Sequence, residues 1–481
     1  MSAPTWDDAN VGTTMQVWCQ YMFSKAEINS DSNYVLTSAF VRGMADVRPG
    51  WHFWVPFPDQ KSGFKYDDDG FFDLPNVTRV SQRMNPRRHG GAVHFDSIWY
   101  DRLFRSVAID VAWCNLVEMC GNIKFSGDSS YNDTFKPVVV AAHNYTIHKS
   151  LPYNVDAMAN IYWAQLVGSA LADWNVYNSD HTRSMVMDNA RESLADDIVQ
   201  RIDERSSRIH LGTLEPSLTY HETGNEIPVI LYNHRLQGYK RWRDTMEVLD
   251  ELHKEGIKFR LRYTNTTREN FGLLAAYPWV ECRLSRTRAE YIEALRGCDL
   301  NVLHSQHETF CISAVESMAC GQPLVAPNGI TFPEITGRTV GTEYPYLFNN
   351  QAECKTMLRR LLTDAAERKK WGRVLSDHVR ASFNATRWAE TYSELFERLD
   401  AERVWTPKPG NAEAFRETMD AHDGRPFMEF YRNLMKVKVN GRGPFGAQSC
   451  PLARASRMVR RFGGGIAVRN GKQYLCARVK S

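Results

Sequence analysis

The 481-residue sequence lacks several features that would assign it to a specialised class of protein. No apolar run approaches the ~18 residues that a membrane-spanning helix needs. The first residues, MSAPTWDDANVG, contain neither a basic cluster nor an apolar segment, so we expect no secretory signal. We therefore expect a cytoplasmic protein. Its length exceeds what one core supports, so we expect two or three domains.

The ten cysteines lack the spacing of a zinc site or of a disulfide framework. No C-x2-C pair is present, and most of the cysteines lie in apolar runs. A free thiol in such surroundings behaves as a small hydrophobic group. We therefore expect reduced, buried cysteines.

Charge is nearly balanced over the whole chain but not along it. The net charge is +3, yet residues 425–481 hold thirteen lysines and arginines against one acid, Glu429. This end therefore carries +12 and leaves −9 on the other 424 residues. A basic segment with interleaved aromatic residues suits a polyanion, because each phosphate that it neutralises releases a counterion. We predict that residues 425–481 form a small basic module that binds DNA, with helices over 427–437 and 451–462 and a two-residue hairpin turn at Asn470-Gly471. The alternative is a surface for solubility or for anionic lipid.

Apolar runs and helical patterns alternate along most of the chain, which favours an α/β fold with parallel sheets. In the first half we expect strands over 15–22, 51–57, 109–117, 137–142, 176–179 and 209–214, and helices over 33–47, 158–174 and 188–202. In the second half we expect strands over 227–232, 257–263, 278–284, 300–303 and 323–326, and helices over 242–256, 287–296, 353–363, 365–383 and 387–399. We predict two Rossmann-like domains, residues 1–215 and 226–400, followed by a polar linker at 401–424.

Two glutamates lie eight positions apart in the strand–helix–strand unit at 299–327. Glu308 follows the first strand, and Glu316 lies about two turns into the helix behind it. Ligands bind at the carboxyl ends of such strands, where helix N-termini direct free N–H groups toward phosphate. We expect Glu308 to lie at that edge.

A second loop at a strand's carboxyl end contains cations. Asn233–Arg241 follows the strand at 227–232 and precedes a helix that begins near Trp242. An arginine can grip a diphosphate with two hydrogen bonds, and a lysine neutralises it as a point charge. We therefore interpret Arg235 and Lys240 as diphosphate ligands, with a solvated basic turn as the alternative.

The segment TFCISAVESMACGQPLVAP, together with Glu308, resembles the pattern E-(S/T)-F-G-x4-E-A-M-A-x-G-x-P-V-V-A of family-four glycosyltransferases. Arg235 and Lys240 are similarly spaced to the family's G-R-x4-K-G. The resemblance covers residues 227–400 well and implies a retaining enzyme of the GT-B fold, in which two Rossmann-like domains face a cleft. Three family glycines are replaced here, by His234, Arg241 and Cys311.

The resemblance also implies roles for individual residues. Glu308 would hold the donor-sugar hydroxyls, Glu316 the ribose, and Arg235 and Lys240 the diphosphate. The remaining donor-binding candidates are Leu284, which would face the base, and Thr309, Phe310 and Cys311, where backbone N–H groups approach the sugar and phosphate.

A histidine follows the apolar strand at 137–142. A lone histidine there is structural in many proteins, but family-four enzymes place one at this point, close to the donor sugar and acceptor. His143 is therefore a catalytic candidate, and His148 is a weaker one.

The chain also contains the acidic triplet Asp67-Asp68-Asp69, which includes the D-x-D pattern of the GT-A class of glycosyltransferases. That class uses the two acids to hold a metal–nucleotide complex. Here the triplet lies in a glycine-bounded polar stretch, so we expect a solvated loop and no metal.

The resemblance implies transfer of a hexose from a nucleotide-sugar, with a UDP-sugar such as UDP-glucose as the expected donor. Arg235 and Lys240 would stabilise the charge that develops on the departing diphosphate, so no metal is required. Combined with the basic C-terminal segment, this predicts a hydroxymethylated pyrimidine in DNA as acceptor, as for bacteriophage DNA glucosyltransferases. The alternatives are a lipid-linked or polysaccharide acceptor, and a DNA-binding protein without activity.

Overall fold

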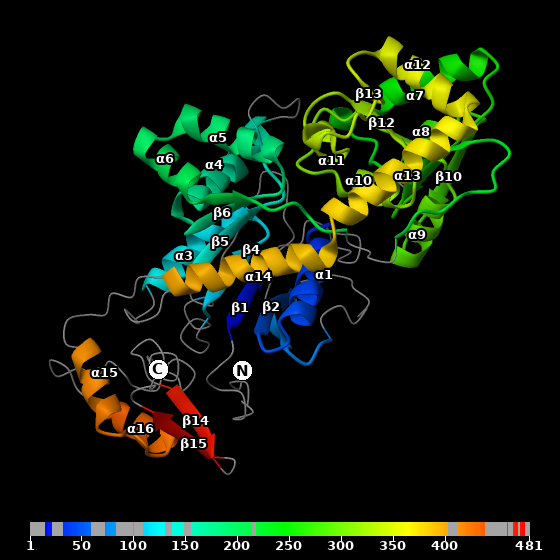
Figure 1. Ribbon diagram of the computed structural model, residues 1–481. Helices are drawn as coiled ribbons and strands as arrows, with labels where there is room; N and C mark the ends of the chain where they lie inside the picture. Colours follow the sequence, from blue (N-terminus) through cyan, green and yellow to red (C-terminus); the bar gives the residue numbers. More distant parts are fainter. Residues whose placement is uncertain are drawn as a thin grey trace.

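Two parallel β-sheets and a small C-terminal unit make up the part of the protein that the structure describes (Figure 1). The computed structural model describes residues 15–21, 32–58, 73–82, 100, 109–129, 137–148, 155–213, 218–268, 270–402, 411–437, 459, 465–469 and 472–476. Helices cover the sheets, as expected for parallel strands that are buried on both faces.

The first sheet has seven parallel strands in the order β3-β2-β1-β4-β5-β6-β7. Its elements are β1 (Gln16–Gln20), α1 (Ser32–Val47), β2 (His52–Pro58), β3 (Val77–Gln82), β4 (Val111–Cys114), η4 (Val117–Met119), α3 (Cys120–Ser129), β5 (Val138–His143), α4 (Val155–Leu171), β6 (Trp174–Tyr177), α5 (Asp180–Ser193), α6 (Asp196–Glu204) and β7 (Ser206–Arg208). The strand order changes direction between β1 and β4, which is where ligands bind in sheets of this type.

Most of the predicted elements of the first half are confirmed, and the differences have local causes. The helix expected over 188–202 is wrong: α5 ends before Leu194, whose backbone is extended, and α6 begins afresh with two acids that suit a helix N-terminus. The strand expected at 209–214 is also wrong, because the last strand is β7, whose Ser-Ser-Arg sequence carries no apolar signal. β3 and α3 were not expected.

The second sheet has six parallel strands in the order β10-β9-β8-β11-β12-β13, the arrangement of dinucleotide-binding folds. Its elements are β8 (Val229–Tyr232), η5 (Gly238–Lys240), α7 (Trp242–Lys254), β9 (Arg260–Asn265), α8 (Phe271–Leu274), β10 (Val280–Leu284), α9 (Arg288–Arg296), β11 (Leu300–Val302), α10 (Ile312–Ala319), β12 (Leu324–Pro327), α11 (Phe332–Ile335), η6 (Arg338–Val340), β13 (Leu347–Phe348), α12 (Gln351–Thr363), α13 (Ala365–Ser382) and α14 (Ala385–Glu402). The direction changes between β8 and β11, so both charged loops follow strands at the switch point.

The last helix of this half returns to the first domain, as expected for the helix at 387–399. Figure 1 shows α13 over the second sheet and α14 lying along the first. Three aromatic rings of α14 surround Phe40 of α1, with ring centroids 5.0–6.4 Å apart. The close approach explains Gly212, where a Cβ atom would lie 2.6 Å from the Cα atom of Ala385.

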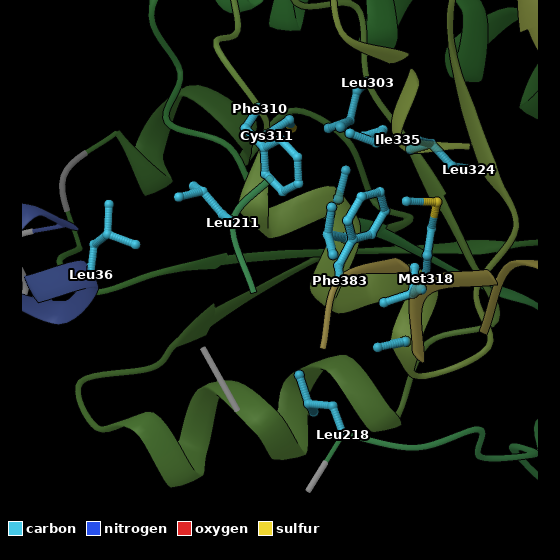
Figure 2. Packing of buried hydrophobic residues seen from close by; sticks show 14 of the residues in the cluster. Leu36, Leu211, Leu218, Leu303, Phe310, Cys311, Met318, Leu324, Ile335 and Phe383 are labelled. Carbon is cyan, nitrogen blue, oxygen red and sulfur yellow. The ribbon is translucent and has the colours of Figure 1, made fainter. Parts of the chain in front are cut away.

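A continuous set of buried apolar residues extends from the first domain into the second. Figure 2 shows Leu211, from the first half of the chain, near Phe310 of the second. Phe310 also packs edge-on against Phe383, with ring centroids 5.2 Å apart. The loop that carries Glu308 is therefore anchored in hydrophobic packing close to where the domains meet.

The C-terminal unit has a core of its own. It consists of α15 (Asn411–Asp420), α16 (Phe427–Leu434) and the antiparallel strands β14 (Gly465–Arg469) and β15 (Lys472–Cys476), drawn in orange and red in Figure 1. Its buried residues include Phe415, Met419, Phe427, Phe430, Leu434, Val459 and Leu475. The predicted hairpin is confirmed, whereas the helix expected over 451–462 lies outside the described residues except for Val459.

The segment 401–424, expected to be a linker, contains α15. Phe415 and Met419 lie one turn apart on this helix and are buried against α16 and β15. Four acids and one arginine of residues 411–424 lower the net charge of residues 411–481 to +9. The domain limits at 215, 226, 400 and 425 stay predictions.

The cysteines agree with expectation. The eight in the described part of the chain are free, and all except Cys282 are buried. Within those same ranges, no helix combines the length and apolar content needed to cross a bilayer.

Candidate functional site

Polar side chains tie together the loops that follow β8 and β11. The Asn301 amide donates to Asn233 Oδ1 at 3.3 Å and to Ser317 Oγ at 2.9 Å. Asn233 in turn donates to the Ser313 carbonyl at 3.0 Å. These bonds fix the start of α10 against the end of β8, and so bring the two predicted ligand-binding loops together.

Lys240 and Glu308 form an ion pair where these loops meet. Lys240 ends η5, Glu308 precedes α10, and the lysine Nζ donates to Glu308 Oε1. Each side chain is only 11% exposed. A buried ion pair persists because removing either partner leaves an uncompensated charge. The structure thus brings together two residues that are distant in the sequence.

Both members of the pair are charged at neutral pH. Burial alone would raise the pKa of Glu308, but attraction to Lys240 and His234 and hydrogen bonds from Lys240 and Ser305 lower it to about 2. Burial alone would lower the pKa of Lys240, but the nearby Glu308 carboxylate raises it. The site therefore holds a carboxylate and an ammonium group that satisfy each other.

Arg235 lies on the same loop and is exposed. It forms no ion pair with a residue in the described ranges, whereas Arg241, six positions on, pairs with Asp244. Arg235 is near enough to His234 to lower the pKa of that imidazole, although burial is the main cause of that shift. An exposed guanidinium at a switch point can meet an incoming anion.

Glu316 is buried on α10, and its carboxylate accepts from Arg288 in the first turn of α9. Arg288 was not predicted from the sequence, where it is one of two arginines, with Arg286, that follow the strand ending at Leu284. Leu284 is half-buried at the end of β10 and is paired with Asn265. No interaction in the described residues joins Leu284 to Glu316.

Two residues that replace family glycines lie in contact. Cys311 Sγ is 3.4 Å from His234 Nε2, and His234 Nε2 is 3.6 Å from Glu308 Oε1. Ser313 Oγ lies 3.1 Å from the same His234 nitrogen. Burial and the positive charge of Lys240 lower the pKa of His234 to about 3, so its imidazole is neutral at physiological pH.

Two of the three positions where this chain replaces a family glycine also have an unusual backbone conformation. Cys311 has a φ of 64° and Arg241 a φ of 47°, both in the left-handed region that favours glycine. At these two positions the chain keeps a glycine-type backbone while carrying a side chain. The two residues begin α10 and α7, so the strained conformation sets how each helix starts.

We predict that Arg241→Gly raises the free energy of unfolding by about 0.5–1 kcal/mol. A left-handed non-glycine residue costs roughly 1–2 kcal/mol, which the loss of an exposed ion pair and the flexibility of glycine in the unfolded chain partly offset. Urea unfolding measures the change. Arg241→Ala keeps the positive φ and is the matched control; an equal gain in both variants would contradict the explanation.

Thr309 and Phe310, expected to bind the donor, make contacts toward the first domain. The Thr309 hydroxyl donates to the Asn144 carbonyl at 2.9 Å, and the Thr309 carbonyl accepts from the hydroxyls of Thr182 and Ser179. Phe310 is buried against His210 and Phe383. Donor contacts by these two residues stay predictions.

His143 lies at the end of β5, with Nε2 2.8 Å from Asn175 Oδ1. It borders a small cavity together with Tyr162, Gln165 and Asn189, among others, and is 2% exposed. Burial lowers its pKa to about 4, although the Asn175 hydrogen bond opposes the shift. Among the described residues, no interaction joins His143 to Lys240 or Glu308, so its catalytic role stays a prediction.

Two other first-domain histidines, His148 and His181, influence His307, the residue that precedes Glu308. Burial is the main cause that lowers the pKa of His307 to about 4, and Lys240, His181 and His148 lower it further by repulsion. His148, the weaker candidate from the sequence, and His181 therefore lie within electrostatic range of the residue that precedes Glu308.

Glu334 joins the two domains and was missed as a functional residue. Its carboxylate accepts the backbone N–H of Asp180 at 2.9 and 3.1 Å and lies 2.6 Å from His210 Nε2. The available signal was Pro333-Glu334-Ile335, which resembles the end of the pattern G-G-x-P-E-(I/L) common in family-four glycosyltransferases. The Asp67–Asp69 triplet lies outside the described residues.

Residues 221–374 match the family model described as Glycosyl transferases group 1. HepE of Anabaena, solved with UDP and glucose, is similar at 12% identity and a TM-score of 0.56, covering 80% of this chain and 100% of that one. The sucrose-phosphate synthase of Thermosynechococcus elongatus is similar at 14% identity and a TM-score of 0.57. That match covers 81% of this chain and 100% of the synthase chain. No curated protein sequence matches.

A third similar solved structure is that of WaaG, a glycosyltransferase involved in lipopolysaccharide biosynthesis. It is 14% identical to this chain and has a TM-score of 0.55. The match covers 79% of this chain and 99% of the WaaG chain. At such low identity these structures establish the fold, while the family match spans the segment that carries Lys240, Glu308 and Glu316. The chain therefore has the GT-B fold and is a glycosyltransferase with a group 1 domain at residues 221–374.

Proposed function

We propose that this glycosyltransferase moves a hexose from a UDP-sugar to an acceptor hydroxyl with retention of configuration. The observation that carries the proposal is the buried Lys240–Glu308 pair beside the exposed Arg235 at the switch point of the second sheet. The similar HepE structures contain UDP and UDP-glucose, which supports a donor of this class. In this proposal residues 226–400 hold the donor and residues 1–215 face the acceptor.

Donor binding exchanges ion pairs within the protein for contacts with the ligand. The diphosphate takes Lys240 from Glu308 and recruits Arg235, so two cations neutralise the leaving group. Freed from the lysine, the Glu308 carboxylate can accept hydrogen bonds from sugar hydroxyls. Glu316 similarly turns from Arg288 to the ribose hydroxyls. Positive charge is then fixed where negative charge develops, which is the effective form of electrostatic catalysis.

Glu308 has no nucleophilic role in this proposal. Retention without a covalent intermediate requires the acceptor oxygen to approach the face that the diphosphate leaves. The bond from the sugar carbon to the acceptor oxygen then forms as the bond to UDP breaks, and the departing phosphate oxygen can take the hydroxyl proton. His143 supports the end of β5, next to Asn144, whose carbonyl accepts the Thr309 hydroxyl.

We propose that the acceptor is a hydroxymethylated pyrimidine in DNA, held by basic residues within 425–481. Arg432 on α16 and Lys436, two residues after its end, are both exposed, and the backbones of β14 and β15 pair Arg469 with Lys472. Cations at such spacing can follow a phosphate backbone. Reaching a base requires it to leave the stack, which a separate DNA-binding unit assists.

Supplying radiolabelled UDP-sugars with hydroxymethylated DNA, unmodified DNA or lipid extract tests the proposal. We expect label in the hydroxymethylated DNA alone. Label in lipid alone would overturn the DNA acceptor and favour a lipid-linked one. No turnover with any donor would favour a DNA-binding protein without activity.

The two cations Arg432 and Lys436 allow a more specific test of DNA binding. Arg432→Gln/Lys436→Gln should weaken transfer to DNA and reduce the slope of log affinity against log salt by about 2, one for each lost phosphate contact. Lys369→Gln/Lys370→Gln removes two exposed lysines from α13 and is the matched control. An equal change in both variants would show that total charge matters and the C-terminal unit does not.

A further inference from the structure

Three side chains with different metal-binding atoms lie together at the switch point of the second sheet. His234, Glu308 and Cys311 are buried or nearly so, and one nitrogen, oxygen or sulfur atom of each lies within 4.8 Å of the other two. His234 comes from the loop after β8, and the other two come from the loop after β11. No other group of this kind occurs within the described ranges.

The spacing of these atoms suits a tetrahedral metal ion. With bonds of roughly 2.0–2.3 Å to nitrogen, oxygen and sulfur, neighbouring ligands of Zn²⁺ lie about 3.3–3.6 Å apart. His234 Nε2 lies 3.4 Å from Cys311 Sγ and 3.6 Å from Glu308 Oε1. These two separations match the expected values, and the Glu308 and Cys311 ligand atoms lie within 4.8 Å of each other.

Two of the three residues replace glycines of the family pattern. A glycine at position 234 or 311 would remove a ligand, so the set exists because both replacements occur in the same chain. Cys311 also adopts a left-handed φ of 64°, a conformation that costs energy for any residue except glycine. A side chain retained at such a position invites a functional explanation.

We propose that His234, Glu308 and Cys311 bind a divalent cation of the Zn²⁺ type. Imidazole nitrogen, thiolate sulfur and carboxylate oxygen are the ligand atoms that Zn²⁺ takes in proteins. Three protein ligands leave a fourth position open to water or to an oxygen of a ligand. On binding, the Cys311 thiol releases its proton to solvent as the sulfur–metal bond forms.

Lys240 competes with the metal in this site. Its ammonium group donates to Glu308 Oε1, the same oxygen that lies near His234, so the metal must displace it. On the proposed function, Glu308 is also the sugar-binding carboxylate, so a bound metal excludes the donor sugar from that oxygen. The cation thereby acts as a reversible inhibitor of transfer.

Titrating the chelator-treated full chain with Co²⁺ tests the site without any donor. Co²⁺ takes the same ligands as Zn²⁺ but absorbs light, and a thiolate ligand adds a charge-transfer band in the near ultraviolet. We expect one equivalent to bind with this band and one equivalent of Zn²⁺ to abolish it. Absence of the band in the wild-type protein would overturn the proposal, whatever the outcome of the transfer assays.

Variants connect the absorption band to Cys311 and His234, and test the competition from Lys240. Cys311→Ser should remove the band, and His234→Gly, which restores the family residue, should weaken Co²⁺ binding at least tenfold. Lys240→Met should strengthen it about tenfold by removing the competing charge. Cys282→Ser changes a half-buried cysteine of β10 and is the matched control, with an unchanged band. A band that persists in Cys311→Ser, or weaker binding in Lys240→Met, would contradict the assignment.

Discussion

Lys240→Met is expected to lower hexose transfer by on the order of 10²–10³-fold and to destabilise the protein by about 3–5 kcal/mol. The loss of activity follows from the missing charge on the diphosphate. The loss of stability follows from Glu308, which stays nearly buried and loses its ammonium partner. Transfer assays and urea unfolding of the same preparation measure the two effects together.

A double-mutant cycle separates the two causes. Lys240→Met/Glu308→Gln removes both charges, so it should recover most of the lost stability, because a neutral amide is cheaper to bury than an unpaired carboxylate. Activity should stay low, since neither diphosphate charge nor sugar carboxylate is restored. If Lys240→Met has the same urea unfolding midpoint as the wild-type protein, the Lys240–Glu308 ion pair is more hydrated than its burial indicates.

The protein is expected to lose stability steeply as the pH falls from about 6.5 toward 4. His143, His304 and His307 have pKa values lowered to about 4, and His234 to about 3, in each case mainly by burial. Below pH 6.5 the unfolded chain takes up protons at these imidazoles while the folded protein does not. Their stabilising contribution is therefore complete above the unfolded pKa and is lost on acidification.

The expected loss of stability on acidification is large because four buried histidines contribute to it together. Lowering a histidine pKa from 6.5 to about 4 corresponds to roughly 3 kcal/mol of unfolding free energy. The sum over the four histidines therefore approaches the total unfolding free energy of an ordinary domain, about 5–15 kcal/mol. Urea midpoints at pH 7.5, 6 and 5 measure the effect. His253→Gln, which removes an exposed imidazole, is the control variant. A midpoint that is flat between pH 7.5 and 5 would show that these imidazoles are hydrated.

The fold could be predicted from the sequence where the apolar pattern was strong. β5 and β8 are continuous apolar runs, and α9 begins with the Thr287–Glu290 capping box. The sequence therefore predicted whether each is a strand or a helix, and approximately where it begins and ends. β7 could not be found, because a three-residue Ser-Ser-Arg strand depends on pairing with β6. α15 was hidden by its polar surroundings, since Phe415 and Met419 are its main apolar signal.

The site was predictable to a similar extent. Each member of the Lys240–Glu308 pair lies in a recognisable sequence motif, and parallel-sheet topology brings the two strand ends together. Arg288 and Glu334 were missed because their partners, Glu316 and Asp180, lie far away in the sequence. The contact between His234 and Cys311 appeared in the sequence only as two unrelated departures from a pattern. Side-chain pairings of this kind are tertiary, and local periodicity contains no information about them.

Thr309 has a consequence for the timing of the catalytic cycle. It follows Glu308 directly and is bound by hydrogen bonds to Asn144, Ser179 and Thr182 of the first domain. A hinge motion that separates the domains must break these bonds or pull the Glu308 loop out of place. On the proposed function, domain opening and disassembly of the sugar-binding site around Glu308 would then be a single event with one rate constant. The apparent donor affinity would scale with the fraction of time that the hinge is shut, so a change at Asn144 could slow turnover without touching the substrate.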